Sequence, residues 1–392
     1  LSDTALNFIL IVGAITALFM GFMGIIQNDI KRVVAYSTLS QLGYMTVALG
    51  ASAYSVAVFH LMTHAFFKAL LFLAAGSVIM GVHHNQDIRY MGGLRKHMPI
   101  TWITALLGSL ALIGTPLFSG FYSKDEIIVA IHASTLPAAG FAYFAVLAGV
   151  FVTAFYSFRM YFLVFHGPER YDQNPDAHHS DHDDDHHGHH DAKPHESPWV
   201  VTAPLLLLAV PSVVIGFMTI GPMLFGDFFK DAIFVNTDIH KAMEVLRAEW
   251  HGPVQLALHG LTAAPFWLAV AGVALAYYLY IVNPALPAKI QTYVQPLYTV
   301  LENKYYMDWF NENVVARGAR LLGTGLWKGG DQALIDGGLV NGSWKLVRWV
   351  SGVVRKVQTG YIYHYALAMI MGIFILISYF STWPMIKELL GK

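Results

Sequence analysis

The sequence predicts an all-α membrane protein with about eight transmembrane helices, one of them broken, and a long lateral amphipathic helical segment. The chain of 392 residues is 56% hydrophobic and 12% charged, with a mean hydropathy of +0.50. This is about half the charge content of a typical soluble domain. Eight apolar stretches have spanning length, at residues 5–26, 33–51, 54–82, 100–133, 140–166, 199–225, 256–283 and 362–383.

The lysines and arginines that flank these spans are unevenly distributed between alternate loops. Seventeen lie on one side, counting Arg159 near the edge of its span, and five lie on the other, while Lys68 and Lys124 lie deeper inside the spans. Because cytoplasmic loops of membrane proteins carry the excess of basic residues, we place the first side in the cytoplasm. Both ends of the chain then face outward.

The third predicted span holds three titratable nitrogens in the run HLMTHAFFKALLF. His60, His64 and Lys68 follow at spacings of four, which places them on one face of a helix. An ammonium at bilayer depth costs at least about 2.5 kcal/mol and normally marks an ion or proton path. The alternative is that Lys68 snorkels to an interface while the histidines bond neighbouring helices. The mid-span position of Lys68 favours a path, along which imidazole and amine groups exchange protons.

The second predicted span carries a polar stripe. Ser37, Gln41 and Tyr44 fall on one helical face at spacings of four and three. Such a stripe either lines a hydrated path beside Lys68 or forms interhelical hydrogen bonds, and the sequence favours neither. Lys31 precedes this span at its cytoplasmic edge, where ordinary flanking charge is the simplest interpretation.

The fourth predicted span, residues 100–133, is too long to be straight. As one helix it measures roughly 50 Å, against a hydrocarbon core of about 30 Å. The run GTPLFSG supplies the helix breakers, and broken helices inside membranes provide ion sites. Lys124 follows as a second candidate for a titrating lysine, with Asp125 as a candidate partner. An interfacial turn is the alternative, but the apolar residues that continue the run favour burial.

Two segments lie outside the spans. Residues 176–195 hold a histidine- and aspartate-rich stretch for which disorder with incidental metal affinity is the favoured interpretation. Residues 284–361 place basic and valine-rich arcs side by side late in the segment, which predicts a helix along the membrane surface or along partner helices. Seven glycines between 323 and 342 predict that this segment is not one unbroken rod.

Some kinds of chemistry have no visible residues in this sequence. Cysteine is absent, which excludes cysteine-ligated iron–sulfur clusters, disulfides and thiol nucleophiles. Neither a dinucleotide fingerprint nor a P-loop occurs. We therefore expect transport rather than redox catalysis, with no catalytic residue, bound cofactor, metal site or nucleic-acid partner in this chain.

Four sequence runs together carry a resemblance to a known family. They are DIKRVVAYSTLSQLGYM, FHLMTHAFFKALLFL, MGGLRK and GTPLFSGFYSKDEI. The chain resembles, over its whole length, the proton-translocating antiporter-like membrane subunits of respiratory complex I, the NADH-quinone oxidoreductase. The lysine in FYSKDEI resembles one branch of the family, whose members end in a lateral helix and an anchoring span. The related M subunit has an acid at that position.

The resemblance assigns roles to the candidate residues. It implies that Lys68 is the central lysine of a half-channel and that His60 and His64 link it along a hydrophilic axis. It implies that Lys124 is the lysine at the outlet, with Asp125 beside it. By the same likeness, Lys31 belongs to this polar chain.

The resemblance also implies an organisation of the chain. The expected parts are a second five-helix antiporter-like repeat (1–166), a His/Asp-rich cytoplasmic loop (167–198), two further spans with an outer loop (199–283), the lateral segment (284–361) and an anchoring span (362–392). The first repeat of the family has no counterpart, and the sequence starts at Leu1 without a methionine. We therefore expect a C-terminal fragment.

The function implied is movement of protons from cytoplasm to periplasm across the bacterial inner membrane, coupled to quinone reduction elsewhere in the complex. NADH, FMN, iron–sulfur clusters and quinone are then expected in partner subunits. The expected partners are the other membrane subunits of complex I, especially the neighbouring M subunit, and the lipid bilayer. Two alternatives are the large subunit of a multisubunit sodium/proton antiporter and a metal transport or storage module built on the histidine-rich stretch.

Overall fold

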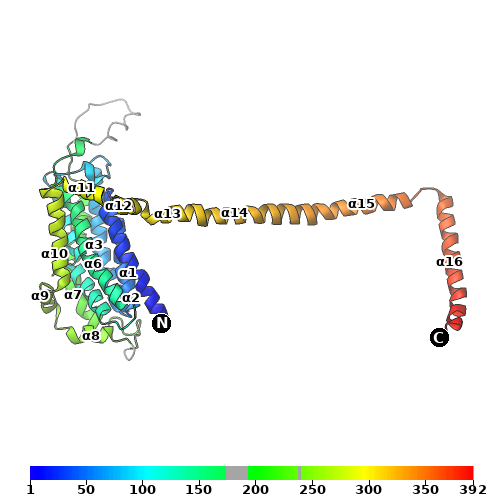
Figure 1. Cartoon of the computed structure of the whole chain (residues 1–392), viewed down its shortest axis with the longest axis horizontal. Helices are drawn as coiled ribbons and strands as arrows, with labels where there is room; N and C mark the ends of the chain where they lie inside the picture. Colours follow the sequence, from blue (N-terminus) through cyan, green and yellow to red (C-terminus); the bar gives the residue numbers. More distant parts are fainter. Residues whose placement is uncertain (174–192, 237–239, 392) are drawn as a thin grey trace. The chain divides into compact units, whose positions relative to one another are not determined.

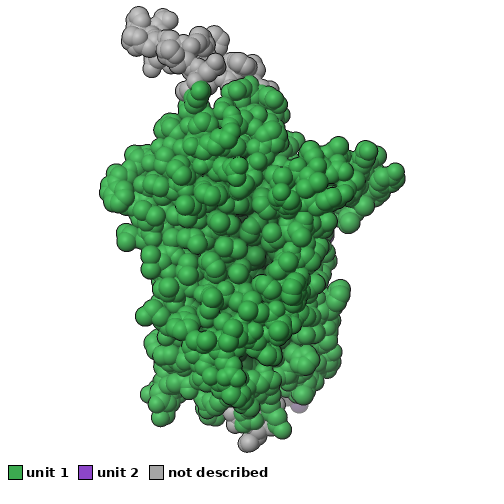
Figure 2. Space-filling model, turned by 90° about the vertical axis from the view of Figure 1, so that its left-hand side faces the viewer, with its two compact units in different colours: residues 1–305 green, residues 306–392 purple. Residues whose placement is uncertain are grey.

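The computed structural model describes residues 1–173, 193–236 and 240–391, and within them the regular structure is helical without a named strand. The chain divides into two compact units, residues 1–305 and 306–392. Figure 2 shows the first unit in green. Most of the histidine-rich stretch, up to residue 192, lies outside the described residues, so its predicted character stays a prediction.

The first unit is a bundle of long helices that run beside one another (Figure 1). Its main helices are α1 (Asp3–Ile26), α2 (Ile30–Gly50), α3 (Tyr54–Gly81), α4 (Pro99–Ile113), α5 (Ser119–His132), α6 (Ala139–Tyr161), α7 (Trp199–Ile220) and α10 (Ala264–Tyr277). Shorter helices are α8 (Ala242–Glu249), α9 (Pro253–Gly260), α11 (Leu286–Tyr293) and α12 (Gln295–Glu302). Within this unit α8 and the N-terminus lie at one end, and α11 and α12 lie at the other.

The predicted all-helical membrane architecture is confirmed. Among the described residues, six helical segments are long and apolar enough to cross a membrane: Asp3–Ile26, Tyr54–Gly81, Ala139–His166, Trp199–Phe225, Ala264–Val282 and Ile362–Glu388. The two other predicted spans correspond to α2, which carries the polar stripe, and to the α4–α5 pair. Three of the six segments end in a widened π-type turn, at Phe162–His166, Gly221–Phe225 and Tyr278–Val282.

The fourth span breaks between α4 and α5, as its length requires. Gly114 ends α4 with φ of +81°, a left-handed conformation that glycine adopts without strain, and Leu117 also has a positive φ of +76°. Gly120 at the start of α5 lies against the carbonyl of Ala111, where a Cβ would come within 1.9 Å of the oxygen. The two half-helices therefore meet by direct backbone contact.

The predicted span at 256–283 differs from the structure in one respect. It is two helices, α9 and α10, which are separated at residues 261–263. Pro265 lies in the first turn of α10, where its fixed φ and missing N–H favour helix initiation. Gly260 is the last residue of α9 and packs against the ring of Phe121. The end of α9 therefore reaches the first turn of α5.

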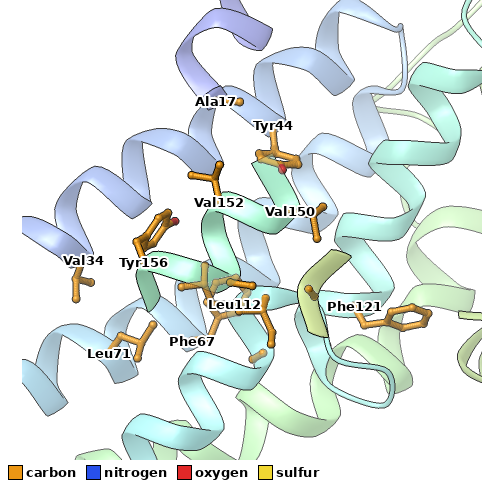
Figure 3. Packing of buried hydrophobic residues seen from close by; sticks show 14 of the residues in the cluster. Ala17, Val34, Tyr44, Phe67, Leu71, Leu112, Phe121, Val150, Val152 and Tyr156 are labelled. Atoms are coloured by element: carbon orange, nitrogen blue, oxygen red, sulfur yellow. The ribbon is translucent and has the colours of Figure 1, made fainter. Parts of the chain in front are cut away.

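Large buried side chains fill the space between α2, α3, α5 and α6. Tyr44, Phe67 and Tyr156 are fully buried in this core (Figure 3). Where α2 crosses α1, Gly43 faces the backbone of Ala17 so closely that a Cβ would lie 2.4 Å from its nitrogen. Small residues thus bring the helices together, which leaves the polar side chains of the core in fixed positions.

The second unit holds a helix that is continuous from Met307 to Val357, so the predicted interruption by glycines is wrong. It consists of α13 (Met307–Phe310), a π-type stretch (Asn311–Ala316), α14 (Arg317–Gly325), a second π-type stretch (Leu326–Val340) and α15 (Asn341–Val357). All glycines in this range keep helical backbone angles with negative φ, and the range contains no proline. Glycine weakens a helix but does not end it. The last helix, α16 (Ile362–Leu389), follows Gly360, whose φ is +76°.

Candidate proton path

Lys68 is buried on α3 and is held by neutral oxygens. Only 4% of its surface is exposed, and its Nζ donates to Ser37 Oγ at 2.6 Å and to the carbonyl of Val34 at 3.4 Å. Tyr156 on α6 donates to the same Ser37 Oγ at 2.7 Å. Lys68 forms no ion pair with a carboxylate in the part of the chain that the structure describes. Neutral partners do not lock the amine in its charged form.

His60 has a hydrogen-bond partner on each ring nitrogen. Its Nδ1 is 2.7 Å from Ser123 Oγ, and its Nε2 is 3.2 Å from Gln41 Oε1. Ser123 is also 2.7 Å from Thr63 Oγ1. The amide nitrogen of Gln41 has no partner among the described residues. Rotation of this amide by about 180° exchanges an acceptor for a donor and accommodates the other His60 tautomer.

His64 occupies the interval between Lys68 and His60. Its ring centroid is 6.0 Å from that of His60 and 5.3 Å from that of Phe67. Its Nε2 is buried without a hydrogen-bond partner within the described ranges. The structure therefore brings the predicted column of α3 together, with an unpartnered imidazole nitrogen between the two hydrogen-bonded sites.

Lys124 lies on α5, directly after Ser123, the hydrogen-bond partner of His60. It is 3% exposed, and its Nζ lies 4.9 Å from the centre of the Tyr44 ring. Tyr44 in turn donates its hydroxyl to the carbonyl of Val146 at 2.5 Å. The predicted pairing of Lys124 with Asp125 is wrong, because no ion pair joins them among the described residues. Successive side chains on a helix point about 100° apart.

Asp125 lines a cavity instead. This cavity has a volume of about 600 Å³ and is bounded by α5, α6, α8, α9 and the start of α10. A narrow second cavity of about 10 Å³ is lined by both Lys124 and Asp125. The lysine and the carboxylate therefore adjoin the same small space without contacting each other.

The stripe on α2 joins these elements. Each of its three predicted residues contacts one titratable residue of the buried set: Ser37 contacts Lys68, Gln41 contacts His60, and Tyr44 contacts Lys124. The sequence left two interpretations of the stripe open, a path beside Lys68 and interhelical hydrogen bonds. Each describes part of this arrangement, because the stripe lies beside Lys68 and also bonds neighbouring helices. Lys31 is not brought to the set; it is exposed in the first turn of α2, where its backbone N–H donates to Asp29.

Several residues near the path were missed by sequence reasoning. Thr63 and Ser123 could have been found from the sequence, because they lie at helical spacings from His60 and Gly120. Tyr156 could not, because it lies in an ordinary aromatic stretch. Glu126 is buried on α5 and is 4% exposed. Arg159 is buried at the end of α6, where it donates to the carbonyl of Gln27, to Asn28 Oδ1 and to Tyr280 OH.

Known proteins are similar to this chain in sequence. Residues 1–155 match the family described as NADH:quinone oxidoreductase/Mrp antiporter, transmembrane. The NADH-quinone oxidoreductase subunit L of Neisseria meningitidis serogroup A is 63% identical over 388 residues. The N-terminal part of the chain therefore resembles this antiporter-type family. The part that matches the antiporter-type family contains every predicted path residue.

More distant relatives are similar over nearly the whole chain. The subunit L of Rhodobacter capsulatus is 39% identical over 92% of this chain, and the NADH-ubiquinone oxidoreductase chain 5 of Marchantia polymorpha is 36% identical over 98%. The chain spans about half the length of these antiporter-type relatives: 57% of both subunit L proteins and 55% of the Marchantia chain. A solved structure of the Mrp complex from a Dietzia species is 19% identical, with a TM-score of 0.44, over 72% of this chain and 48% of that one.

Proposed function

We propose that this chain carries the lysine-bearing half of a proton path in a membrane subunit of the L type, within the NADH-quinone oxidoreductase of a bacterial inner membrane. The complete subunit moves protons from cytoplasm to periplasm, coupled to quinone reduction elsewhere in the complex. NADH, FMN, iron–sulfur clusters and quinone belong to partner subunits, and the neighbouring M subunit is the closest membrane partner. The names of the relatives support this assignment.

The observation that carries the proposal is the set of buried polar groups from α6 to α5. Hydrogen bonds join Tyr156 through Ser37 to Lys68, and His60 is within hydrogen-bond distance of Ser123; the His64 ring lies between these groups, 6.0 Å from the His60 ring. No carboxylate neutralises either buried lysine within the described residues. A buried lysine or histidine becomes neutral, not negative, when it loses its proton. Such groups are therefore suited to pass protons rather than to store them.

The mechanism follows from the chemistry of these groups. Lys68 holds a proton on Nζ while Ser37 accepts its hydrogen bond. His60 takes up a proton on one ring nitrogen and releases the proton on the other, since both nitrogens have partners. Two ammonium groups in a low-dielectric region disfavour each other, so a proton on Lys68 favours release from Lys124.

Lys68→Ala in the complete subunit, assembled in the complex, tests this function. We expect strong loss of proton pumping with normal assembly, because the central proton-holding group is gone. Lys96→Ala is the matched control, since Lys96 is an exposed lysine paired with Glu169. Wild-type pumping and quinone reduction in Lys68→Ala would disprove the relay role.

One alternative function is favoured by the family description itself, which includes Mrp antiporters. A sodium/proton antiporter is distinguished by sodium-driven pH changes in vesicles that lack NADH and quinone. Deletion of residues 176–195 separates the metal alternative, because the pump proposal expects little loss of pumping after that deletion.

The proposed division of the chain follows the same family. Residues 1–166 form the second antiporter-like repeat, 167–198 a cytoplasmic loop, 199–283 two further spans, 284–361 a brace along neighbouring subunits, and 362–392 the anchoring span. The unbroken helix from Met307 to Val357 supports the brace, because a continuous helix transmits a fixed length. Deletion of residues 302–358 is expected to impair assembly of the complex more than the residual turnover.

A further inference from the structure

The cavity beside α5 has features that the path described above does not use. Three histidines, His132, His251 and His259, line it together with Asp125 and Glu249. They come from α5, from α8 and α9, and from the connection between α8 and α9. A space of about 600 Å³ with several polar walls is large enough for many water molecules.

The cavity connects to the buried lysine through α9. Gly260, the last residue of α9, packs on Phe121, and it also lines the narrow cavity shared by Lys124 and Asp125. His259 is the preceding residue and faces the larger cavity. The two cavities share Asp125 and Pro265 in their walls, so they adjoin.

Exposure increases along this line of residues. Lys124 is buried, Asp125 is half-buried and His259 is exposed. The ring of His259 has no hydrogen-bond partner among the described residues, so both nitrogens are free to exchange protons with water. His251 differs, because its Nδ1 is 2.8 Å from the carbonyl of Glu249. His132 packs against the ring of Tyr143 at 5.0 Å.

We infer that His259 is the last proton carrier at the outlet that the resemblance implies: it receives the proton from Asp125 and passes it to water in this cavity. The inference rests on the proposed function. In the step, the Asp125 carboxyl gives its proton to the lone pair of one His259 ring nitrogen, which forms an imidazolium. The imidazolium then gives a proton to a water molecule, and hydronium and neutral imidazole result.

The other charged groups around Asp125 fit this direction of transfer. Lys124 and Glu126 flank it on α5, and Glu249 of α8 and His259 of α9 act on it electrostatically. α6 contributes Tyr143 to the wall of the cavity. Glu249 and His259 line the same cavity, so the acid on α8 adjoins the space into which the proton is released.

The first experiment uses His259→Gln in the complete subunit within the complex, with His251→Gln as the matched control. We expect pumping to fall roughly tenfold in His259→Gln, less than the factor of about 100 typical of positioned proton-transfer groups, because cavity water replaces the imidazole in part. The deficit should shrink as the outer pH is raised, because a lower outer proton concentration favours release to water. His259→Glu should restore pumping, and His251→Gln should match wild type.

A second experiment does not depend on pumping. The chain has no cysteine, so a single introduced thiol is a clean probe of water access. Ile128 lines both cavities, whereas Ala130 is a fully buried residue of the same helix that lines neither. A charged, membrane-impermeant thiol reagent added from the outer side should modify Ile128→Cys and leave Ala130→Cys unmodified.

The outcomes separate the two proposals. Wild-type pumping and an unchanged pH profile in His259→Gln, or equal labelling of the two thiols, overturns the outlet. If Lys68→Ala loses pumping while His259→Gln does not, only the outlet proposal fails. If Lys68→Ala also pumps normally, the proposed function fails.

Discussion

The Lys124 ammonium lies 4.9 Å from the centre of the Tyr44 ring and has no hydrogen-bond acceptor within the described part of the chain. The ring is fixed by the hydrogen bond from its own hydroxyl to Val146 on α6. A cation over an aromatic face gains about 2 kcal/mol when it is desolvated. That stabilises the charged lysine without a carboxylate that would trap its proton.

Replacement of Tyr44 tests this relationship. Tyr44→Phe keeps the ring and loses one hydrogen bond, so we expect nearly normal pumping and a loss of about 1 kcal/mol in stability. Tyr44→Leu removes the aromatic face and should lower the pumping rate severalfold, measured by dye quenching in membrane vesicles. Equal pumping by the two variants would show that the ring does not support Lys124.

Ser37 is the shared acceptor of Lys68 and Tyr156, and its removal should uncouple them. Ser37→Ala leaves Lys68 Nζ with the carbonyl of Val34 at 3.4 Å, and we expect slower pumping with little change in stability. Thr38→Ala is the control, because the Thr38 hydroxyl donates only to the backbone of its own helix. A loss of pumping of the same size in Thr38→Ala would contradict a specific role for Ser37.

The contact between the two halves of the broken helix depends on a missing side chain. Gly120→Ala places a Cβ 1.9 Å from the carbonyl oxygen of Ala111, so we expect destabilisation of about 3 kcal/mol or failure of the complex to assemble. Gly76→Ala is the matched control within α3, since nothing lies within 4 Å of its added Cβ. It should stabilise the helix by about 0.5–1 kcal/mol. Thermal denaturation of the purified complex measures both.

A pH-dependent contact lies in the connections outside the spans. The pKa of Glu169 is held below its usual value because Tyr171 OH and Lys96 Nζ donate to its carboxylate. A lowered folded-state pKa means that this contact contributes stability above the unfolded pKa of about 4.3 and loses it as the pH falls through the folded value. The protection factors against hydrogen exchange of residues 88–96 should therefore fall as the pH drops below about 4.3, and Glu169→Gln should remove that dependence. An unchanged acid response in Glu169→Gln would assign it to another group.

Local periodicity predicted much of the site. The spacing of four that links His60, His64 and Lys68 is sufficient to put them on one helical face, whatever the helix packs against. The same argument held for the face shared by Ser37, Gln41 and Tyr44. Periodicity failed where neighbours on the helix point apart: Lys124 and Asp125 share one narrow cavity, but only Lys124 contacts Tyr44 and only Asp125 lines the larger cavity.

The sequence could not predict contacts between distant helices. Nothing in the aromatic stretch around Tyr156 marks it as a partner of Ser37, 119 residues away. The end of α9 at Phe121 and the cavity beside it likewise depend on how five helices pack. In the second unit, glycine composition suggested breaks, but backbone angles decide continuity, and they remain helical throughout.

The sequence by itself determined the membrane class, the breaking of the fourth span and the faces that carry the titratable residues, because hydropathy, length and helical period are local properties. Tertiary structure alone decided which polar atoms meet. It joined Lys68 to Ser37, set Lys124 over Tyr44 without a counter-ion, and turned Asp125 toward a cavity closed by α9. These are properties of packing, where a rotation of one helix by one residue, about 100°, would exchange every partner.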